Sequence, residues 1–328
     1  MARSGVTALL ACALAAGPVQ ALAAPDGPTV SFVWENDSFA NTDRNYTNGV
    51  RLSWLSGERE AQGISGWIAA QMGAEPGTVR RRGFAIGHTL FTPREIDVAE
   101  FLPDQHPYAG YAYVEANAVL EQSRRIDTFT AQLGLVGPSA QGEFLQNEFH
   151  DLIGVAEAKG WDNQIGDEVG LNLSFDRKQR VRSRDVFEDL QADLTPNFGF
   201  TVGTLRTHAH GGLTLRLGQG LRADYGPPRV SPSLGGAGYF RRSPGLSWYV
   251  YGGVEGRAVA HDMIREGSLF GGDARSIDPE RFVADLQFGF VVQYDAVQVS
   301  FTGVRRTKEF EQQNGAQKWG AFTVSRKF

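Results

Sequence analysis

Apolar and polar residues alternate along most of the chain, with the period of two that is typical of β-strands whose faces meet different surroundings. The segment 169–176, for example, reads Val-Gly-Leu-Asn-Leu-Ser-Phe-Asp. Twelve such segments are predicted as strands: residues 28–37, 46–56, 81–92, 109–121, 125–137, 166–179, 185–203, 206–218, 246–259, 281–293, 296–306 and 316–328. An even number of strands, each with an apolar face for lipid and a polar face for a lumen, predicts an all-β fold, a transmembrane antiparallel β-barrel.

The first residues are expected to be a signal peptide, residues 1–23. Arg3 precedes a short apolar run, and Ala21-Leu22-Ala23 offers a cleavage site between small residues. Cys12, the only cysteine, lies inside that run. A lipoprotein cleavage at Cys12 is the less favoured alternative, because the apolar run continues past it. Residues 24–328 are then expected to form a single barrel domain without a thiol.

The rest of the composition narrows the class of protein. After residue 23, the sequence contains no stretch of about 18 apolar residues, so no membrane-spanning helix is predicted. The chain has 40 glycines, a formal net charge of −5 and no basic run, so no nucleic-acid partner is expected. Phe322, Val324 and the final residue Phe328 fall on one face of the last predicted strand, an ending similar to that of exported barrel proteins. Location in the outer membrane of a Gram-negative bacterium is therefore expected.

A polar cluster joins the first two predicted strands. Residues 34–49 read Trp-Glu-Asn-Asp-Ser-Phe-Ala-Asn-Thr-Asp-Arg-Asn-Tyr-Thr-Asn-Gly. Carboxylate, amide and backbone oxygens are the ligands that Ca²⁺ prefers, so the cluster is a candidate calcium site. The alternative is a polar hairpin loop made of residues that favour turns.

Two further polar segments stand between predicted strands. Residues 104–110 read Asp-Gln-His-Pro-Tyr-Ala-Gly, at the start of the fourth strand. Residues 141–153 carry an apolar stripe at helical spacing, with Gln146 and His150 on its flank, and the segment Gly-Trp-Asp-Asn-Gln follows at 160–164. Judged from its spacing alone, His150 is better explained as a structural histidine on the flank of a helix, where it makes one hydrogen bond.

The predicted topology places these segments together. If the N-terminus is periplasmic, the connections after the first, third and fifth strands all lie on the external side. Those connections contain the polar cluster, the segment 104–110 and the predicted helix. We therefore expect the three to meet at one rim, beside the outer leaflet.

The amino-acid sequences of the three segments resemble motifs of the outer-membrane lipid A 3'-O-deacylases. The family shares an Asn-Asp followed by Asp-Arg-x-Tyr-Thr-Asn-Gly, an Arg-Pro-Tyr-Ala-Gly element, and a helix with a histidine before Gly-Trp-Asp-x-Gln. The resemblance covers essentially the whole mature chain, with one departure: His106 stands where the family has arginine. A histidine there would bind a phosphate or an oxyanion weakly and in a pH-dependent way.

The resemblance implies a Ca²⁺-dependent esterase that removes an acyl chain from lipid A. By it, His150 is the general base, Asp37 the Ca²⁺ ligand, and Asn36 and Thr47 shape the site. The resemblance also implies supporting or substrate-binding roles for Tyr46, His106, Tyr108, Asp162 and Gln164. Asp162 and Gln164 are the candidates to orient His150. Lipopolysaccharide and outer-membrane lipids are the implied partners, with the protein acting as a monomer.

Two alternatives remain open at this stage. An outer-membrane phospholipase would use the same chemistry on another lipid, and a non-enzymatic pore or structural barrel would use the three segments only to close its loops. No Gly-x-Ser-x-Gly motif is present, so a serine nucleophile is not indicated. His208 and His210 share one strand face and are predicted to line the lumen. Residues 63–74 predict a short amphipathic helix near the inner membrane face.

Overall fold

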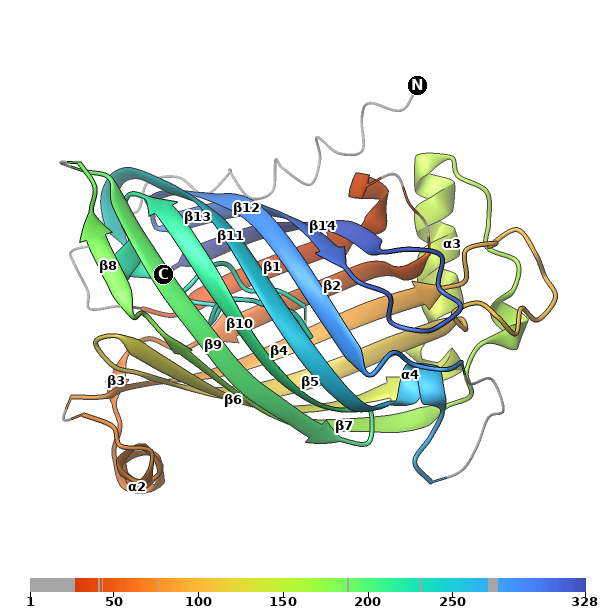
Figure 1. The fold of residues 1–328 in the computed structure, drawn as a ribbon, viewed down its shortest axis with the longest axis horizontal. Coiled ribbons are helices and arrows are strands. Elements are labelled where there is room, and N and C mark those ends of the chain that lie inside the picture. The colour runs from red at the N-terminus through yellow and green to blue at the C-terminus, as the bar shows by residue number, and fades with distance from the viewer. Residues whose placement is uncertain are drawn as a thin grey trace.

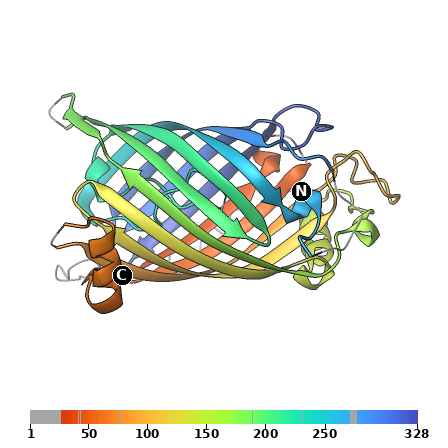
Figure 2. The ribbon, with the colours of Figure 1, turned by 60° about the horizontal axis from the view of Figure 1, so that its bottom comes forward.

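The computed structural model describes residues 27–40, 42, 44–75, 77–187, 189–230, 232–270 and 277–328. Over these residues the chain forms a closed antiparallel barrel, which Figures 1 and 2 show from two sides. The first strand pairs with the last, from Thr29 opposite Lys327 to Asn36 opposite Gly320, and this pairing closes the sheet. The predicted signal peptide and Cys12 lie outside the described residues.

Twelve long strands make up the wall in the described part of the chain, as predicted. They are β1 (Thr29–Asn36), β2 (Asn45–Leu55), β4 (Val79–Thr92), β5 (Ala109–Glu121), β6 (Arg125–Val136), β7 (Glu168–Gln179), β9 (Gln191–Gly203), β10 (Arg206–Gly218), β11 (Ser243–Asp262), β12 (Phe282–Asp295), β13 (Val297–Arg306) and β14 (Gln317–Lys327).

The predicted strand 185–203 is wrong at its beginning. The chain forms a short strand β8 (Arg182–Asp185), turns, and returns as β9, with Asp185 paired to Gln191. A second short strand, β3 (Arg59–Glu60), pairs with β4.

The two faces of the wall differ as the alternation predicts. Outward side chains such as Phe84 and Ile86 are 62% and 59% exposed. Inward side chains are polar and paired: Arg51 binds Glu115 at 2.6 Å, and Arg306 binds Asp285 at 2.7 Å. A lipid-facing belt thus surrounds a lumen held together by ion pairs.

Part of the β10–β11 connection, residues 219–230 and 232–242, enters the lumen. Arg229 reaches across to Glu35 at 2.7 Å, Arg216 binds Asp224 at 2.6 Å, and Lys327 donates to the carbonyl of Phe240. This lumen strap, as we call it, includes the short 3₁₀ helix η4 (Leu221–Ala223). A polar cavity of about 160 Å³ remains beside it in the lumen.

The remaining helices lie at the two ends of the barrel (Figure 2). One end carries η1 (Asp37–Ala40), η2 (Pro138–Ala140), α3 (Gly142–Ile153), η3 (Trp161–Asn163) and α4 (Met263–Glu266). The other end carries α2 (Gly63–Gln71), close to its predicted position. The backbone N–H of Phe328 donates to Pro28 there, so both described chain ends lie at that end. Among the described helices, none has the length and apolar character needed to cross a membrane.

Candidate active site

Helix α3 begins on the outer face of the barrel wall. Gly110 has the same orientation on β5 as the exposed Val114, and a Cβ built on it would lie 3.0 Å from the Cα of Gly142. Beside it, His88 Nε2 on β4 donates to the carbonyl of Ala140 at 2.7 Å. The glycine of the Pro-Tyr-Ala-Gly segment is therefore needed for the close approach of the helix to the wall.

The other end of α3 reaches β1. The rings of Phe149 and Trp34 lie 6.3 Å apart in an edge-to-face contact. From β5 to β1 the sheet order is β5, β4, β2, β1, which is three strand spacings of about 4.8 Å each. Gly142 and Phe149 are about 10 Å apart along the helix axis, and side chains cover the remainder. Helix α3 therefore extends from β5 to β1 at the rim, and it lies across the barrel axis (Figure 1).

The polar residues at the ends of β1 and β2 face the same side of the wall. Asn48 Oδ1 accepts hydrogen bonds from Trp34 Nε1 at 3.0 Å and from Asn36 Nδ2 at 3.2 Å. Trp34 and Asn36 share the orientation of the exposed Phe32. The Trp34–Phe149 contact thus brings the residue before His150 against the strand that ends in Asn36. The predicted convergence of the first and third segments is confirmed.

Hydrogen bonds hold the side chains of Asp37 and Thr47 in place. Asp37 is 1% exposed, and its Oδ2 accepts from the backbone N–H of Arg44 at 2.8 Å. Thr47 Oγ1 and Thr92 Oγ1 share a hydrogen bond of 2.7 Å.

The atoms around Asp37 that could ligate a metal ion determine which cation would fit. They are oxygens: the Asp37 carboxylate, the amide oxygen of Asn36, the Thr42 hydroxyl and backbone carbonyls. In the described part of the chain, no group of three or more His, Cys, Asp or Glu side chains is placed to hold a metal ion. Among the described residues, these oxygen atoms with one carboxylate fit a hard cation such as Ca²⁺, and do not suit a metal that requires nitrogen or sulfur.

His150 is oriented by the backbone. Its side chain is buried, and Nδ1 lies 2.7 Å from the carbonyl oxygen of Ala156. A carbonyl only accepts, so Nδ1 carries the proton in the neutral ring and Nε2 has the lone pair. Asp162 and Gln164 were the predicted orienting groups; at Nδ1 that position is taken by a main-chain carbonyl instead, and Asp162 is exposed.

Gln146 lies one turn before His150 on the same buried face of α3. Its Oε1 accepts from Trp161 Nε1 at 2.9 Å, which fixes the orientation of the amide because the indole only donates. Within the described structure, the buried Nε2 makes no hydrogen bond. The sequence placed Gln146 only on the flank of the helix; its spacing of four from His150 was the available signal.

Tyr108 supports the site from the side. Its ring lies 4.8 Å from that of Trp161, and its hydroxyl donates to the Ile96 carbonyl at 3.3 Å. These two rings pack with Leu90 and Ala158. The second and third segments of the sequence therefore meet in one apolar cluster that carries the loops over the wall.

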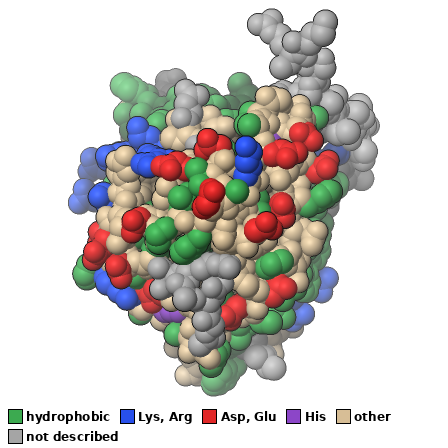
Figure 3. Space-filling model, turned by 90° about the vertical axis from the view of Figure 1, so that its right-hand side faces the viewer, with side chains coloured by type: hydrophobic (Ala, Val, Ile, Leu, Met, Phe, Trp, Pro, Cys, Tyr) green, Lys and Arg blue, Asp and Glu red, His purple; other side chains and the backbone are tan. Residues whose placement is uncertain are grey.

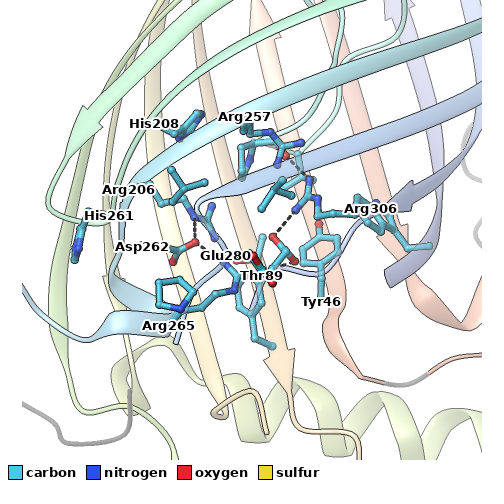
Figure 4. Close-up of a pocket in the computed structure, with 18 of the residues that line it drawn as sticks. Tyr46, Thr89, Arg206, His208, Arg257, His261, Asp262, Arg265, Glu280 and Arg306 are labelled. Carbon is cyan, nitrogen blue, oxygen red and sulfur yellow. Dashed lines mark hydrogen bonds and ion pairs between the residues drawn. The ribbon is translucent and has the colours of Figure 1, made fainter. Parts of the chain in front are cut away.

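Tyr46 faces the lumen rather than α3. Its hydroxyl donates to Glu35 at 3.0 Å, and its ring packs on Phe91 and Trp319. It lines a lumenal pocket just inside the rim, in which Figure 4 shows Asp262 beside Arg206 and Arg265. The structure thus separates Tyr46 from Asn36 and His150 by the thickness of the barrel wall.

His106 also lies on the lumenal side. It is 1% exposed, its ring stacks on Phe91 at 5.3 Å, and its Nδ1 donates to the Pro107 carbonyl at 2.8 Å. Burial, together with the nearby Arg265 guanidinium, lowers the pKa of His106 to about 4. A neutral, buried imidazole does not replace the phosphate-binding charge that an arginine would bring.

His208 and His210 lie where the sequence predicts them, and His88 has an anchoring role. His208 and His210 border the lumenal cavity, and His210 Nε2 lies 3.1 Å from Asp176. His88, which the sequence left without a role, holds the turn before α3. Figure 3 looks onto the rim and shows acidic side chains spread over this face, with apolar side chains between them.

Comparison with known proteins agrees with this architecture. The family model described as outer membrane protein LpxR matches residues 8–328. The solved structure of LpxR from Salmonella typhimurium is 18% identical, covers 92% of this chain and 100% of its own, and superposes with a TM-score of 0.76. The β domain of the Bordetella autotransporter BrkA is 10% identical, with 93% and 99% coverage and a TM-score of 0.45. No curated protein matches the sequence. The chain belongs to the LpxR family of outer membrane proteins.

Proposed function

We propose that the protein is an outer-membrane esterase that hydrolyses the acyl chain linked through the 3' oxygen of lipid A. The observation that carries this proposal is the position of His150, held by α3 against the outer wall beside the outer leaflet. A substrate embedded in that leaflet reaches the outer wall without entering the lumen. Family membership supports the same class of lipid.

In the proposed reaction, His150 acts as the general base. The hydrogen bond from Nδ1 to Ala156 holds the ring and leaves the lone pair on Nε2, the arrangement needed to accept a proton from water. The water oxygen then attacks the ester carbonyl. When the bond between the acyl carbon and the sugar oxygen breaks, the protonated His150 gives its proton to that oxygen, so the products are a fatty acid and a sugar hydroxyl. No covalent intermediate with the protein is required.

Asp37 would hold the calcium ion, with help from the amide oxygen of Asn36. When bound, Ca²⁺ supplies positive charge that polarises the ester carbonyl. Thr47, fixed by Thr92, and Asn36, fixed by Asn48, shape the polar surface on which the ester rests.

An open pore is a weaker alternative. The lumen strap crosses the barrel and is tied to the wall by the Arg229–Glu35 and Arg216–Asp224 ion pairs. A transport role also gives no reason for burying a histidine between a helix and the lipid side of the wall.

The experiment is mass spectrometry of lipid A from cells with and without the protein. Expression should remove the 3'-linked acyl group, and the His150→Ala protein at equal abundance should not. Phospholipid hydrolysis is measured in the same samples. Release of phospholipid acyl chains with intact lipid A would instead identify a phospholipase, and no release from either lipid would reject the esterase proposal.

A further inference from the structure

The surface of α3 is divided into three arcs of different character. One arc is buried against the wall and loops: Gly142, Gln146 and His150. A second arc is exposed and carries the acidic side chains Glu143, Glu148 and Asp151, with Phe144 among them. The third arc, which we call the apolar arc, contains Leu145, Phe149, Leu152 and Ile153.

Most of the apolar arc faces away from the protein. Leu152 is 76% exposed and Leu145 is 42% exposed, whereas the polar Gln146 and His150 are buried. A helix in water has the reverse arrangement, because each large apolar side chain left in water forgoes about 1.5–3 kcal/mol of burial. This arrangement therefore indicates a non-aqueous neighbour for the apolar arc.

The direction of the apolar arc follows from its contacts. Phe149 packs on Trp34, an outward side chain of β1, and Trp34 packs on Phe39 at 5.1 Å. Phe39 packs on Phe301 at 5.7 Å, and Phe301 packs on Phe290 within the lipid-facing belt at 6.4 Å. The apolar arc is thus continuous, through aromatic contacts, with the surface that meets hydrocarbon.

The orientation of the helix agrees with such a neighbour. Because α3 extends from β5 to β1 at the rim, it runs across the barrel axis and along the membrane plane (Figure 1). A helix in this orientation, with one apolar and one charged side, is typical of segments that lie in a membrane interface.

From these observations we propose that the apolar arc binds acyl chains of the outer leaflet, and that it guides the chain to be cleaved toward His150. The membrane contact stands on the exposure and the aromatic continuity alone. The guiding role rests on the proposed esterase function. It is inferred because Phe149, in the apolar arc, directly precedes His150. The charged arc faces the aqueous side.

The first test measures the position of the two arcs without any activity. Cys12 lies in the predicted signal peptide, so Leu152→Cys is expected to give a processed chain with one thiol for a nitroxide label. Glu143→Cys is the matched control, because Glu143 is exposed and lies on the opposite side of the helix from Leu152. The proteins are reconstituted in vesicles of phosphatidylethanolamine and lipopolysaccharide. Oxygen, which concentrates in lipid, should speed the relaxation of the label at 152 more than that of the label at 143. A water-soluble nickel chelate should have the reverse effect. Equal access of the chelate to both labels would overturn the proposal.

The second test measures the guiding role. Leu145→Gln combined with Leu152→Gln should raise the apparent KM for lipid A in vesicles by at least about tenfold, the effect of weakening two apolar contacts. Hydrolysis of a short-chain ester dispersed in detergent should be unchanged, and Glu148→Gln should alter neither. An unchanged KM would remove the guiding role, and it leaves the label result to decide the membrane contact. Failure of the esterase proposal is recognised separately, because the unaltered protein would then hydrolyse neither substrate.

Discussion

Gly110 of the barrel wall and Gly142 of helix α3 are in direct backbone contact. A Cβ on Gly110 would lie 3.0 Å from the Gly142 Cα, and a Cβ on Gly142 would lie 2.6 Å from the Trp161 ring. These glycines let the helix lie directly on the strands, with Trp161 holding it from the other side. The position of His150 depends on this contact, although it is eight residues further along the helix.

Gly110→Val should therefore lower activity by displacing α3. A shift of about 1 Å in a catalytic group costs on the order of 10²-fold in rate, so a loss of that size in kcat is expected. The control is Gly256→Val on β11, where an added Cβ meets nothing within 4 Å. Both proteins should assemble as heat-modifiable barrels. Equal activity of the two would show that the close approach is not needed.

Asp37→Ala should weaken the activation by calcium. If its carboxylate is the charged ligand, the variant should need a higher Ca²⁺ concentration for half-maximal activity, and excess Ca²⁺ should partly restore the rate. The control is Asp104→Ala, which removes an exposed carboxylate from a loop at the same rim. Full activity of Asp37→Ala in the presence of chelator would contradict the metal role.

His106 should make the fold sensitive to acid. Its pKa is about 4 in the folded protein and near 6.5 when unfolded, so the unfolded chain binds more protons between these values. Stability should therefore fall as the pH drops from about 6.5 to about 4. His106→Gln should lose less stability over this range, measured as the temperature of heat modification at pH 7 and pH 4.5. An identical loss in both proteins would place the acid sensitivity elsewhere.

The barrel was predictable from sequence because lipid outside and paired polar groups inside impose the alternation directly. The error at 185–203 arose at a turn whose sequence lacks the strongest turn-forming residues. The β8–β9 turn runs over residues 186–190, Val-Phe-Glu-Asp-Leu, without glycine, proline or asparagine. Such a turn resembles a continuous strand. The lumen strap was not predicted, since an irregular segment with many glycines and prolines gives no periodic signal of its position.

The site was only partly predictable for a related reason. Alternation assigns a side chain to the lumen or the lipid side only while the register is regular, and β2 has a register shift between Tyr46 and Asn48. Tyr46 therefore points inward while Asn48 points outward. His106 precedes β5 in a loop, where no alternation applies. Order along the chain brought three segments to one rim, but it did not say which side of the wall each side chain faces.

Phe328 is predicted to matter for assembly rather than for chemistry. Its side chain is exposed, and it lies beside Pro28 at the end opposite α3. Phe328→Ser should lower the amount of assembled barrel and leave the activity per folded molecule unchanged. Phe187→Ser, which changes another exposed phenylalanine, between β8 and β9, should not affect assembly. A normal amount of assembled Phe328→Ser barrel would contradict the targeting role.

The proposed mechanism requires His150 to take the proton from the attacking water. The most direct measurement is kcat and KM for the wild type, His150→Ala and His150→Asn between pH 5 and 9, with barrel assembly checked by gel mobility. We expect assembled variants that bind Ca²⁺ and lose about 10²-fold to 10⁴-fold in kcat with little change in KM. The wild-type rate should also fall in acid, because protonated imidazole accepts no proton. An assembled His150→Ala that keeps a tenth or more of the wild-type kcat, or changes only KM, would contradict the role of His150 as general base.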